Sequence, residues 1–158
     1  VARRDFAIDA AITSDCAPLA AAVKAMFDAI PDRAAIHTIR DATRGGVGTV
    51  LHEIAAESQV GIELNTPAIP VAPEVRGVCG LLGLEPLYLA CEGRLVIFAP
   101  QAIAPTLVEV LRTLPDSRQA AVIGRVTPDF SGRVVLNTEI GTKPLLPEPS
   151  GELLPRIC

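Results

Sequence analysis

The sequence predicts an α+β domain of layered architecture, in which helices flank a mixed β-sheet. Apolar residues make up 49% of the 158 residues, which is enough for a hydrophobic core in a chain of this length. Stretches with apolar residues at helical spacing alternate with short stretches of strand-like alternation. No internal repeat or linker divides the first part of the chain, so we expect one domain over residues 1–137 and a tail over 138–158.

The first half of the predicted domain contains two helices and two strands. A helix is expected over residues 16–30, with Ser14 or Asp15 as its N-cap and Pro18 in its first turn. A short strand at 36–40 leads into a glycine-containing loop, and a second helix at 47–58 carries an apolar stripe. Residues 61–64 read as the next strand.

The second half continues the alternation of helices and strands. Pro73 is placed to begin a helix that Gly83 ends. Residues 87–99 read as two strand-like segments joined at Glu92 and Gly93. A helix over 103–114 and strands over 121–126 and 133–136 complete the predicted domain.

Charge and cysteine content exclude several classes of function. The net charge of −4 offers no electrostatic footprint for nucleic acid or an anionic membrane, and no apolar run approaches the length of a membrane span. We therefore expect a cytoplasmic protein. We also expect no metal site within this chain, because the four cysteines lack metal-ligand spacing. Cys16 and Cys79 are expected to be buried core thiols. The start at Val1 suggests a piece of a longer protein.

The chain ends in a thiol, Cys158, on a segment that is poor in regular structure. Four prolines and two glycines between residues 141 and 155 prevent a lasting helix or central strand. An extended arm from Asn137 would span up to roughly 70 Å. Such an arm can carry a reactive thiol between sites, or it can be a terminus without function. Its apolar residues, Leu145 and Leu146 among them, suggest that it docks on something.

Residues 41–46, Asp-Ala-Thr-Arg-Gly-Gly, lie between a predicted strand and a predicted helix. The first N–H groups of a helix lack internal partners and sit at its positive end, and glycines allow an anion to approach the backbone. The spacing is not that of a P-loop. The alternative is an ordinary cap followed by a turn.

Glu92 is a carboxylate within an otherwise apolar stretch. It is either a plain turn residue or, if buried among Leu89, Leu95 and Ile97, a proton acceptor whose pKa is raised toward neutrality.

Three motifs together resemble one family. The terminus Pro155-Arg156-Ile157-Cys158, the loop at 41–46 and the Glu-Gly pair at Glu92 resemble the C-terminal half of the HypE family of hydrogenase maturation proteins. The resemblance runs from about Ser14 to Cys158. The loop alone indicates the wider superfamily of aminoimidazole ribonucleotide synthetase-like ATP enzymes, whose C-terminal domain has the predicted fold. The cysteine tail distinguishes HypE within it.

The resemblance implies a reaction and its participants. HypF loads a carbamoyl group on Cys158, ATP phosphorylates its oxygen, and Glu92 removes protons as the group becomes a thiocyanate. The cyano group then passes to iron in a HypC–HypD complex that serves [NiFe] hydrogenase. ATP and Mg²⁺ are held mainly by an N-terminal half, which also forms the homodimer. The residues expected near the nucleotide in this chain are Asp41, Thr43, Arg44, Gly45 and Gly46.

Two alternatives remain open from the sequence. The isolated piece can be a module that docks partner proteins without catalysis, or the chain can belong to another ATP-dependent synthetase of the superfamily. Arg44 contacts phosphate or the carbamoyl oxygen if it takes part in the reaction, and it forms a surface ion pair if it does not. Removal of Cys158 separates the classes, because only the HypE chemistry requires that thiol.

Overall fold

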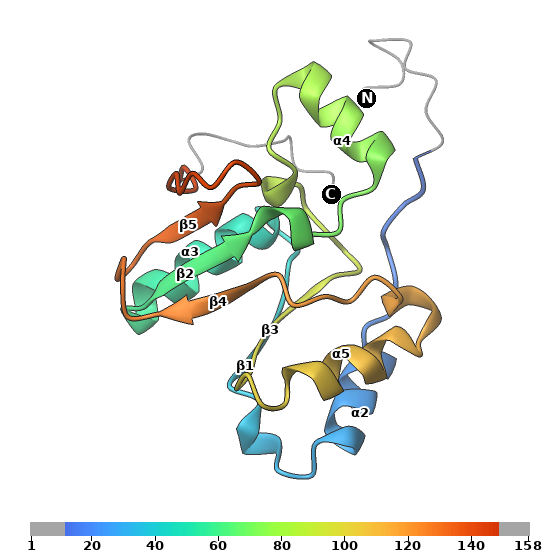
Figure 1. The fold of residues 1–158 in the computed structure, drawn as a ribbon. Helices are drawn as coiled ribbons and strands as arrows, with labels where there is room; N and C mark the ends of the chain where they lie inside the picture. The colour runs from blue at the N-terminus through green and yellow to red at the C-terminus, as the bar shows by residue number, and fades with distance from the viewer. Residues whose placement is uncertain (1–11, 149–158) are drawn as a thin grey trace.

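The computed structural model of the chain describes residues 12–148 (Figure 1). None of the helices within this range is long and apolar enough to cross a membrane. The helices are α2 (Ala20–Ala29), α3 (Gly46–Ser58), α4 (Pro73–Leu82) and α5 (Ala104–Arg112), with a short 3-10 turn η3 at Pro86–Tyr88. The strands are β1 (Thr38–Asp41), β2 (Gly61–Asn65), β3 (Leu95–Phe98), β4 (Gly124–Thr127) and β5 (Val134–Asn137).

The strands form two sheets where the sequence predicted one. β1 and β3 pair antiparallel, with Arg40 opposite Val96. The other sheet has the order β4-β2-β5 and is mixed, because β2 runs antiparallel to β4 and parallel to β5. The predicted class, an α+β fold with a mixed sheet flanked by helices, is confirmed.

The two-stranded sheet separates two hydrophobic cores. One core joins α3 to the three-stranded sheet, and the other joins α2 to α5. Figure 1 shows α3 against the sheet of β4, β2 and β5, and the α2–α5 pair beside β1 and β3. β3 serves both cores, because Val96 belongs to the first while Leu95 and Ile97 pack against the second. This division follows from the alternation of side chains along a strand.

Local capping signals located some elements well and failed for others. α4 begins at Pro73 and ends before Gly83, which adopts φ +65°, as predicted. The predicted cap at Ser14 or Asp15 is wrong, because α2 begins at Ala20 without a side-chain cap. Tertiary packing holds the preceding segment out of the helix: a Cβ on Gly93 would overlap the carbonyl of Asp15.

The first strand predicted within 87–99 is also wrong. This stretch begins with η3, in which the Glu85 side chain accepts a hydrogen bond from the N–H of Leu87 at 3.3 Å. Only the second segment forms a strand, β3. Among the thiols, the prediction of burial is confirmed for Cys79 and wrong for Cys16, which is exposed.

The described part of the predicted arm, residues 138–148, packs on the domain rather than standing free. Leu145 bridges to Val135, and Leu146 is 3% exposed within the first core. The N–H of Leu146 donates to the carbonyl of Val134 at 2.8 Å. Leu146 therefore docks on the chain's own sheet, while the side chains of Ile140 and Leu145 remain exposed. Cys158 lies outside the described residues.

Candidate functional site

The backbone of Ala42 joins the two motifs that the sequence singled out. Its N–H donates to the carbonyl of Arg94 at 3.1 Å, and its carbonyl accepts from the N–H of Cys91 at 3.0 Å. Ala42 is fully buried. The loop at 41–46 and the turn at 91–93 are therefore neighbours, and we call the surface that they share the Ala42 junction.

The two glycines of the loop are required by the protein's own packing. Gly45 and Gly46 adopt φ of +73° and +63°, a left-handed conformation that glycine tolerates best. A Cβ on Gly46 would overlap the carbonyl oxygens of Leu87 and Leu89. Gly46 thus allows the start of α3 to approach the backbone that leads to Cys91.

The polar side chains of the junction face solvent. Asp41, Arg44 and Glu92 are exposed, and Thr43 is half-buried. Within residues 12–148 Arg44 has no ion pair or side-chain hydrogen bond, so the surface ion pair considered from the sequence is not seen. The positive end of α3 and a guanidinium that pairs with no side chain of residues 12–148 suit an anion.

The burial considered for Glu92 is wrong. The residue lies in the turn between η3 and β3, where Gly93 is buried and Glu92 itself is exposed. Any chemistry at Glu92 would therefore rest on accessibility and on groups that approach it, rather than on burial within this chain.

Cys91, the neighbour of Glu92, is an unreactive thiol in this setting. Its Sγ donates to the carbonyl of Leu89 at 3.3 Å. Burial, followed by the negative charge of Asp15, raises the pKa of the Cys91 thiol above its ordinary value. The thiolate is therefore disfavoured at neutral pH. Cys91 instead stabilises the turn through its hydrogen bonds to the carbonyls of Ala42 and Leu89.

The segment that leads toward Cys158 is held close to the junction by Tyr88. The Tyr88 hydroxyl donates to the carbonyl oxygen of Pro147, and its oxygen lies 3.0 Å from Nε2 of His52. Tyr88 is 7% exposed, and burial with the nearby charges of Glu85 and Glu148 raises its pKa to about 12. The phenol is accordingly neutral and able to donate at physiological pH.

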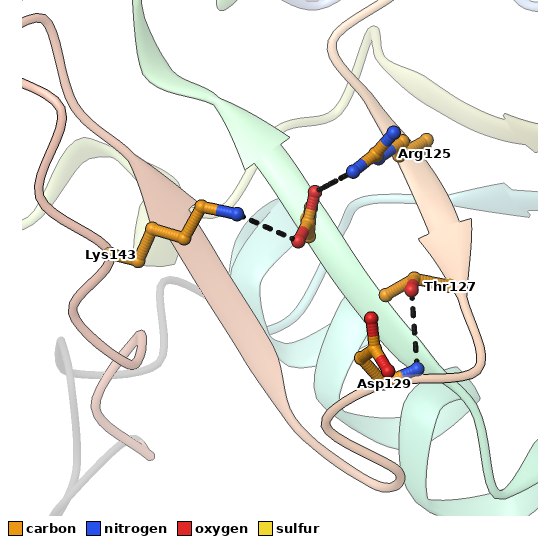
Figure 2. A network of polar contacts seen from close by, with 5 residues as sticks. Arg125, Thr127, Asp129 and Lys143 are labelled. Atoms are coloured by element: carbon orange, nitrogen blue, oxygen red, sulfur yellow. Dashed lines mark hydrogen bonds and ion pairs between the residues drawn. The ribbon is translucent and has the colours of Figure 1, made fainter.

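A buried carboxylate ties the same segment to the three-stranded sheet. Glu63 on β2 is 4% exposed and pairs with Arg125 at 2.7 Å and with Lys143 at 3.2 Å. Figure 2 shows Lys143 and Arg125 reaching one carboxylate from opposite sides. Hydrogen bonds from Arg125 and then Lys143 hold the Glu63 pKa below its ordinary value. The charged form is therefore the stable one.

The sequence interpretation missed Tyr88, His52, Glu63 and Lys143. One signal was available: Glu63 is a lone carboxylate in a strand with apolar neighbours, and a buried carboxylate needs a cationic partner. Nothing local identified that partner, since Lys143 is 80 residues away in the chain. Tyr88 was taken as a strand residue.

Residues 12–148 offer no group of three or more His, Cys, Asp or Glu side chains that could hold a metal ion. Mg²⁺ that accompanies a nucleotide is usually held by one or two carboxylates together with phosphate oxygens, so Asp41 and Glu92 would not hold the ion without a bound nucleotide. A surface hollow of about 550 Å³ is lined by Thr66, Pro67, Arg76, Thr138, Glu139 and Ile140. Of the predicted site residues that the structure describes, none lines it.

Comparison with known proteins places this geometry in context. Residues 3–137 match the family "AIR synthase related protein, C-terminal domain". The chain is 42% identical over 157 residues to the protein named carbamoyl dehydratase HypE of Rhodobacter capsulatus, covering 99% of this chain and 45% of that protein. The chain therefore spans about half the length of the curated relatives it matches.

Two solved structures resemble the fold over most of the chain. A hydrogenase maturation protein HypE in complex with ATP has a TM-score of 0.86 at 38% identity, covering 99% of this chain and 47% of that one. A HypE–HypF complex has a TM-score of 0.85 at 34% identity, covering 94% of this chain and 47% of the matched one.

Proposed function

This chain belongs to the family of AIR synthase related proteins, as its C-terminal domain, and we propose that it is part of an ATP-dependent carbamoyl dehydratase of the HypE type. The dehydratase would serve [NiFe] hydrogenase maturation by making the cyanide ligands of the active-site iron. One observation carries the proposal. Hydrogen bonds of Ala42 bring a loop suited to phosphate beside the exposed carboxylate of Glu92, in a chain similar over 99% of its length to carbamoyl dehydratases.

The reaction requires both a loop that binds phosphate and a carboxylate that acts as a base. A thioester-like carbamate on Cys158, S–C(=O)–NH₂, accepts a phosphoryl group from ATP on its oxygen, and one N–H proton leaves. The S–C(OPO₃)=NH group then loses phosphate and its second N–H proton, and the product is S–C≡N. The balance is one ATP to ADP and phosphate with loss of the elements of water. Phosphorylation makes the oxygen a good leaving group, and a base must accept the protons.

Each role falls on a residue of this chain. Cys158 is the covalent carrier, because sulfur is a good nucleophile and a good carrier atom. Glu92 is the base: its carboxylate is exposed and therefore open to a group brought to it. Arg44, with the N-terminal N–H groups of α3, would hold phosphate, and Asp41 and Thr43 would contact the nucleotide.

Gly45 and Gly46 support this site indirectly. Gly46 lets the loop fit against Leu87 and Leu89, which sets where Glu92 stands relative to α3, and Gly45 leaves room for the Thr49 side chain. Mg²⁺ would balance charge on the transferring phosphoryl group, and the rest of the full-length protein would supply most of the residues that hold it.

The partners follow from the same proposal. HypF would donate the carbamoyl group and the HypC–HypD complex would accept the cyano group, in the cytoplasm. The rest of a full-length protein would supply most of the ATP site and the homodimer contacts. A chain that only docks these partners would bind them without any change at Cys158.

A pair of cysteine variants tests the proposal. The full-length protein, its Cys158→Ser variant and its Cys16→Ser variant are incubated with HypF, a carbamoyl donor and ATP, and then analysed by peptide mass spectrometry. Cys16 is the matched control, since it is an exposed thiol that no step of the proposed reaction uses. We expect modification of the wild type and Cys16→Ser, and none of Cys158→Ser. Equal modification of all three proteins, or of none, would refute the carrier role.

A further inference from the structure

We propose that Tyr88 is a positioning residue that fixes the point from which the terminal segment leaves the domain. The purpose of this anchor rests on the proposed function, but the contacts that define it do not. The Tyr88 hydroxyl donates to the carbonyl oxygen of Pro147, and that residue is followed by eleven more before the chain ends. The contact therefore sets the start of the segment that carries Cys158.

The hydrogen bonds at Tyr88 have a defined direction. A phenol has one hydrogen, and the carbonyl of Pro147 can only accept, so the Tyr88 oxygen must accept from His52. His52 Nε2, 3.0 Å away, therefore carries a hydrogen, in the matching neutral tautomer or in the imidazolium form. The two rings are nearly parallel, with an interplanar angle of 6°. His52 on α3 therefore donates to Tyr88 on η3, and Tyr88 donates to Pro147 in the terminal segment.

Tyr88 is rigidly held within the same structure that forms the Ala42 junction. A Cβ on Gly48 would overlap the Tyr88 ring, so α3 presents a glycine where the aromatic ring packs. Glu92 is four positions after Tyr88, so their Cα atoms are at most about 14 Å apart. The anchor therefore lies near the proposed base.

The preceding residues deliver Pro147 to Tyr88. Leu146 is buried, its N–H bonds to Val134, and Lys143 pairs with Glu63 at 3.2 Å. Tyr88 extends this docking by one residue and takes a carbonyl group that would otherwise face water. Pro147 is thus the last residue of the described segment that a buried side chain of the domain holds by a hydrogen bond.

The anchor shortens the reach of the terminal thiol. Eleven residues span at most roughly 36 Å, whereas an arm released at Asn137 would span roughly 70 Å. Effective concentration falls as about the −3/2 power of linker length. Docking of the segment through Pro147 as a whole, in which the Tyr88 contact is the last step after Lys143 and Leu146, therefore keeps Cys158 up to about threefold more concentrated at the junction than a fully released arm would.

Amide hydrogen exchange of the full chain tests the anchor. Tyr88→Phe removes the hydroxyl and keeps the ring that packs on Gly48. We expect the Leu146 amide to exchange about fivefold faster in this variant, the effect of one lost hydrogen bond on local opening. The Ile62 amide, which bonds to Arg133 in the same sheet, is the internal control and should be unchanged. Unchanged exchange at Leu146, or an equal acceleration at both amides, would overturn the proposal.

The two proposals fail in different ways. Exchange needs neither ATP nor a carbamoyl donor, so it tests the anchor alone, whereas an unmodified Cys158 in the wild type would refute only the proposed function. Where Cys158 is modified, Tyr88→Phe should slow the ATP-dependent loss of water by less than about threefold, because Leu146 and Lys143 still hold the segment, and it should leave the ATP concentration for half-maximal rate unchanged. A rate equal to that of the wild type would show that the anchor positions nothing.

Discussion

The N–H of Cys91 lies 3.0 Å from the carbonyl oxygen of Ala42, although 49 positions separate these residues in the chain. Together with the bond from Ala42 to Arg94, this contact places the turn of Glu92 beside the start of α3. The junction consists of backbone hydrogen bonds and glycine packing, and its polar side chains remain exposed. Such a surface is ready to receive a group brought from elsewhere.

Gly46→Ala should disrupt this junction. The new Cβ meets the carbonyls of Leu87 and Leu89 and a positive φ, so we expect a loss of about 2–5 kcal/mol in the free energy of unfolding. Gly83→Ala is the matched control, because Gly83 has a similar φ of +65° and no neighbour near its Cβ; it should cost about 1–2 kcal/mol. Urea denaturation measures both values. A cost for Gly46→Ala no greater than that for Gly83→Ala would show that the close approach is unimportant.

The Glu63 ion pairs should make the free energy of unfolding depend on pH in the acidic range. The folded-state pKa of Glu63 is lowered, so the unfolded chain binds the proton first as pH falls below the ordinary value of 4.5. The stabilisation is present above that value and is lost as pH falls through the lowered folded pKa. Thermal melts between about pH 3 and pH 6 should show a flatter dependence for Glu63→Gln than for the wild type. Glu57→Gln is the control, because Glu57 is exposed. If the melting temperature depended on pH identically in all three proteins, the role assigned to Glu63 would be contradicted.

Tyr88 should make the free energy of unfolding fall as the pH rises in the alkaline range. Its pKa is raised from 10 to about 12, so the folded state keeps the proton that the unfolded state loses, and stability should fall as pH rises through this window. The chain has one tyrosine and no tryptophan, so phenolate absorbance reports Tyr88 alone. We expect the phenolate to appear near pH 12 in the folded protein and near pH 10 in denaturant. Titration near pH 10 in both states would mean that the phenol is not buried as described.

Glu92→Gln should block the proposed reaction after carbamoylation. An amide cannot take the N–H protons, so the S-carbamoyl group on Cys158 should accumulate while its transfer from HypF continues. We expect at least a 100-fold slower loss of water, the usual scale of general base catalysis. Glu85→Gln is the control, because Glu85 lies in the same segment between α4 and β3 but outside the turn that contains Glu92. Dehydration at the normal rate in Glu92→Gln would assign the base to another residue.

Elements with strong local signals could be predicted from the sequence, and long-range pairings could not. Pro73 and Gly83 bounded α4 because each acts through its own backbone dihedral angles. The loop before α3 was recognised for the same reason. The division of strands into two sheets was missed, since it depends on which strands meet, and no local pattern specifies that.

The candidate site was predicted in part for the same reason. Asp41, Arg44 and Glu92 were identified by their motifs, and the structure brings the two motifs together through Ala42. The burial of Glu92 was wrong because the segment before it forms η3 rather than a strand, which leaves the turn exposed. Tyr88 was missed because its importance comes from Pro147, which lies 59 residues away.

Intact-mass analysis of the full-length protein, incubated with HypF, a carbamoyl donor and ATP, tests the central claim most directly. The account predicts that Cys158 first gains one carbamoyl group and then loses the mass of one water, and that the second change requires ATP. Cys158 remaining unmodified while ATP is consumed would contradict it and would point to a different activity within the superfamily.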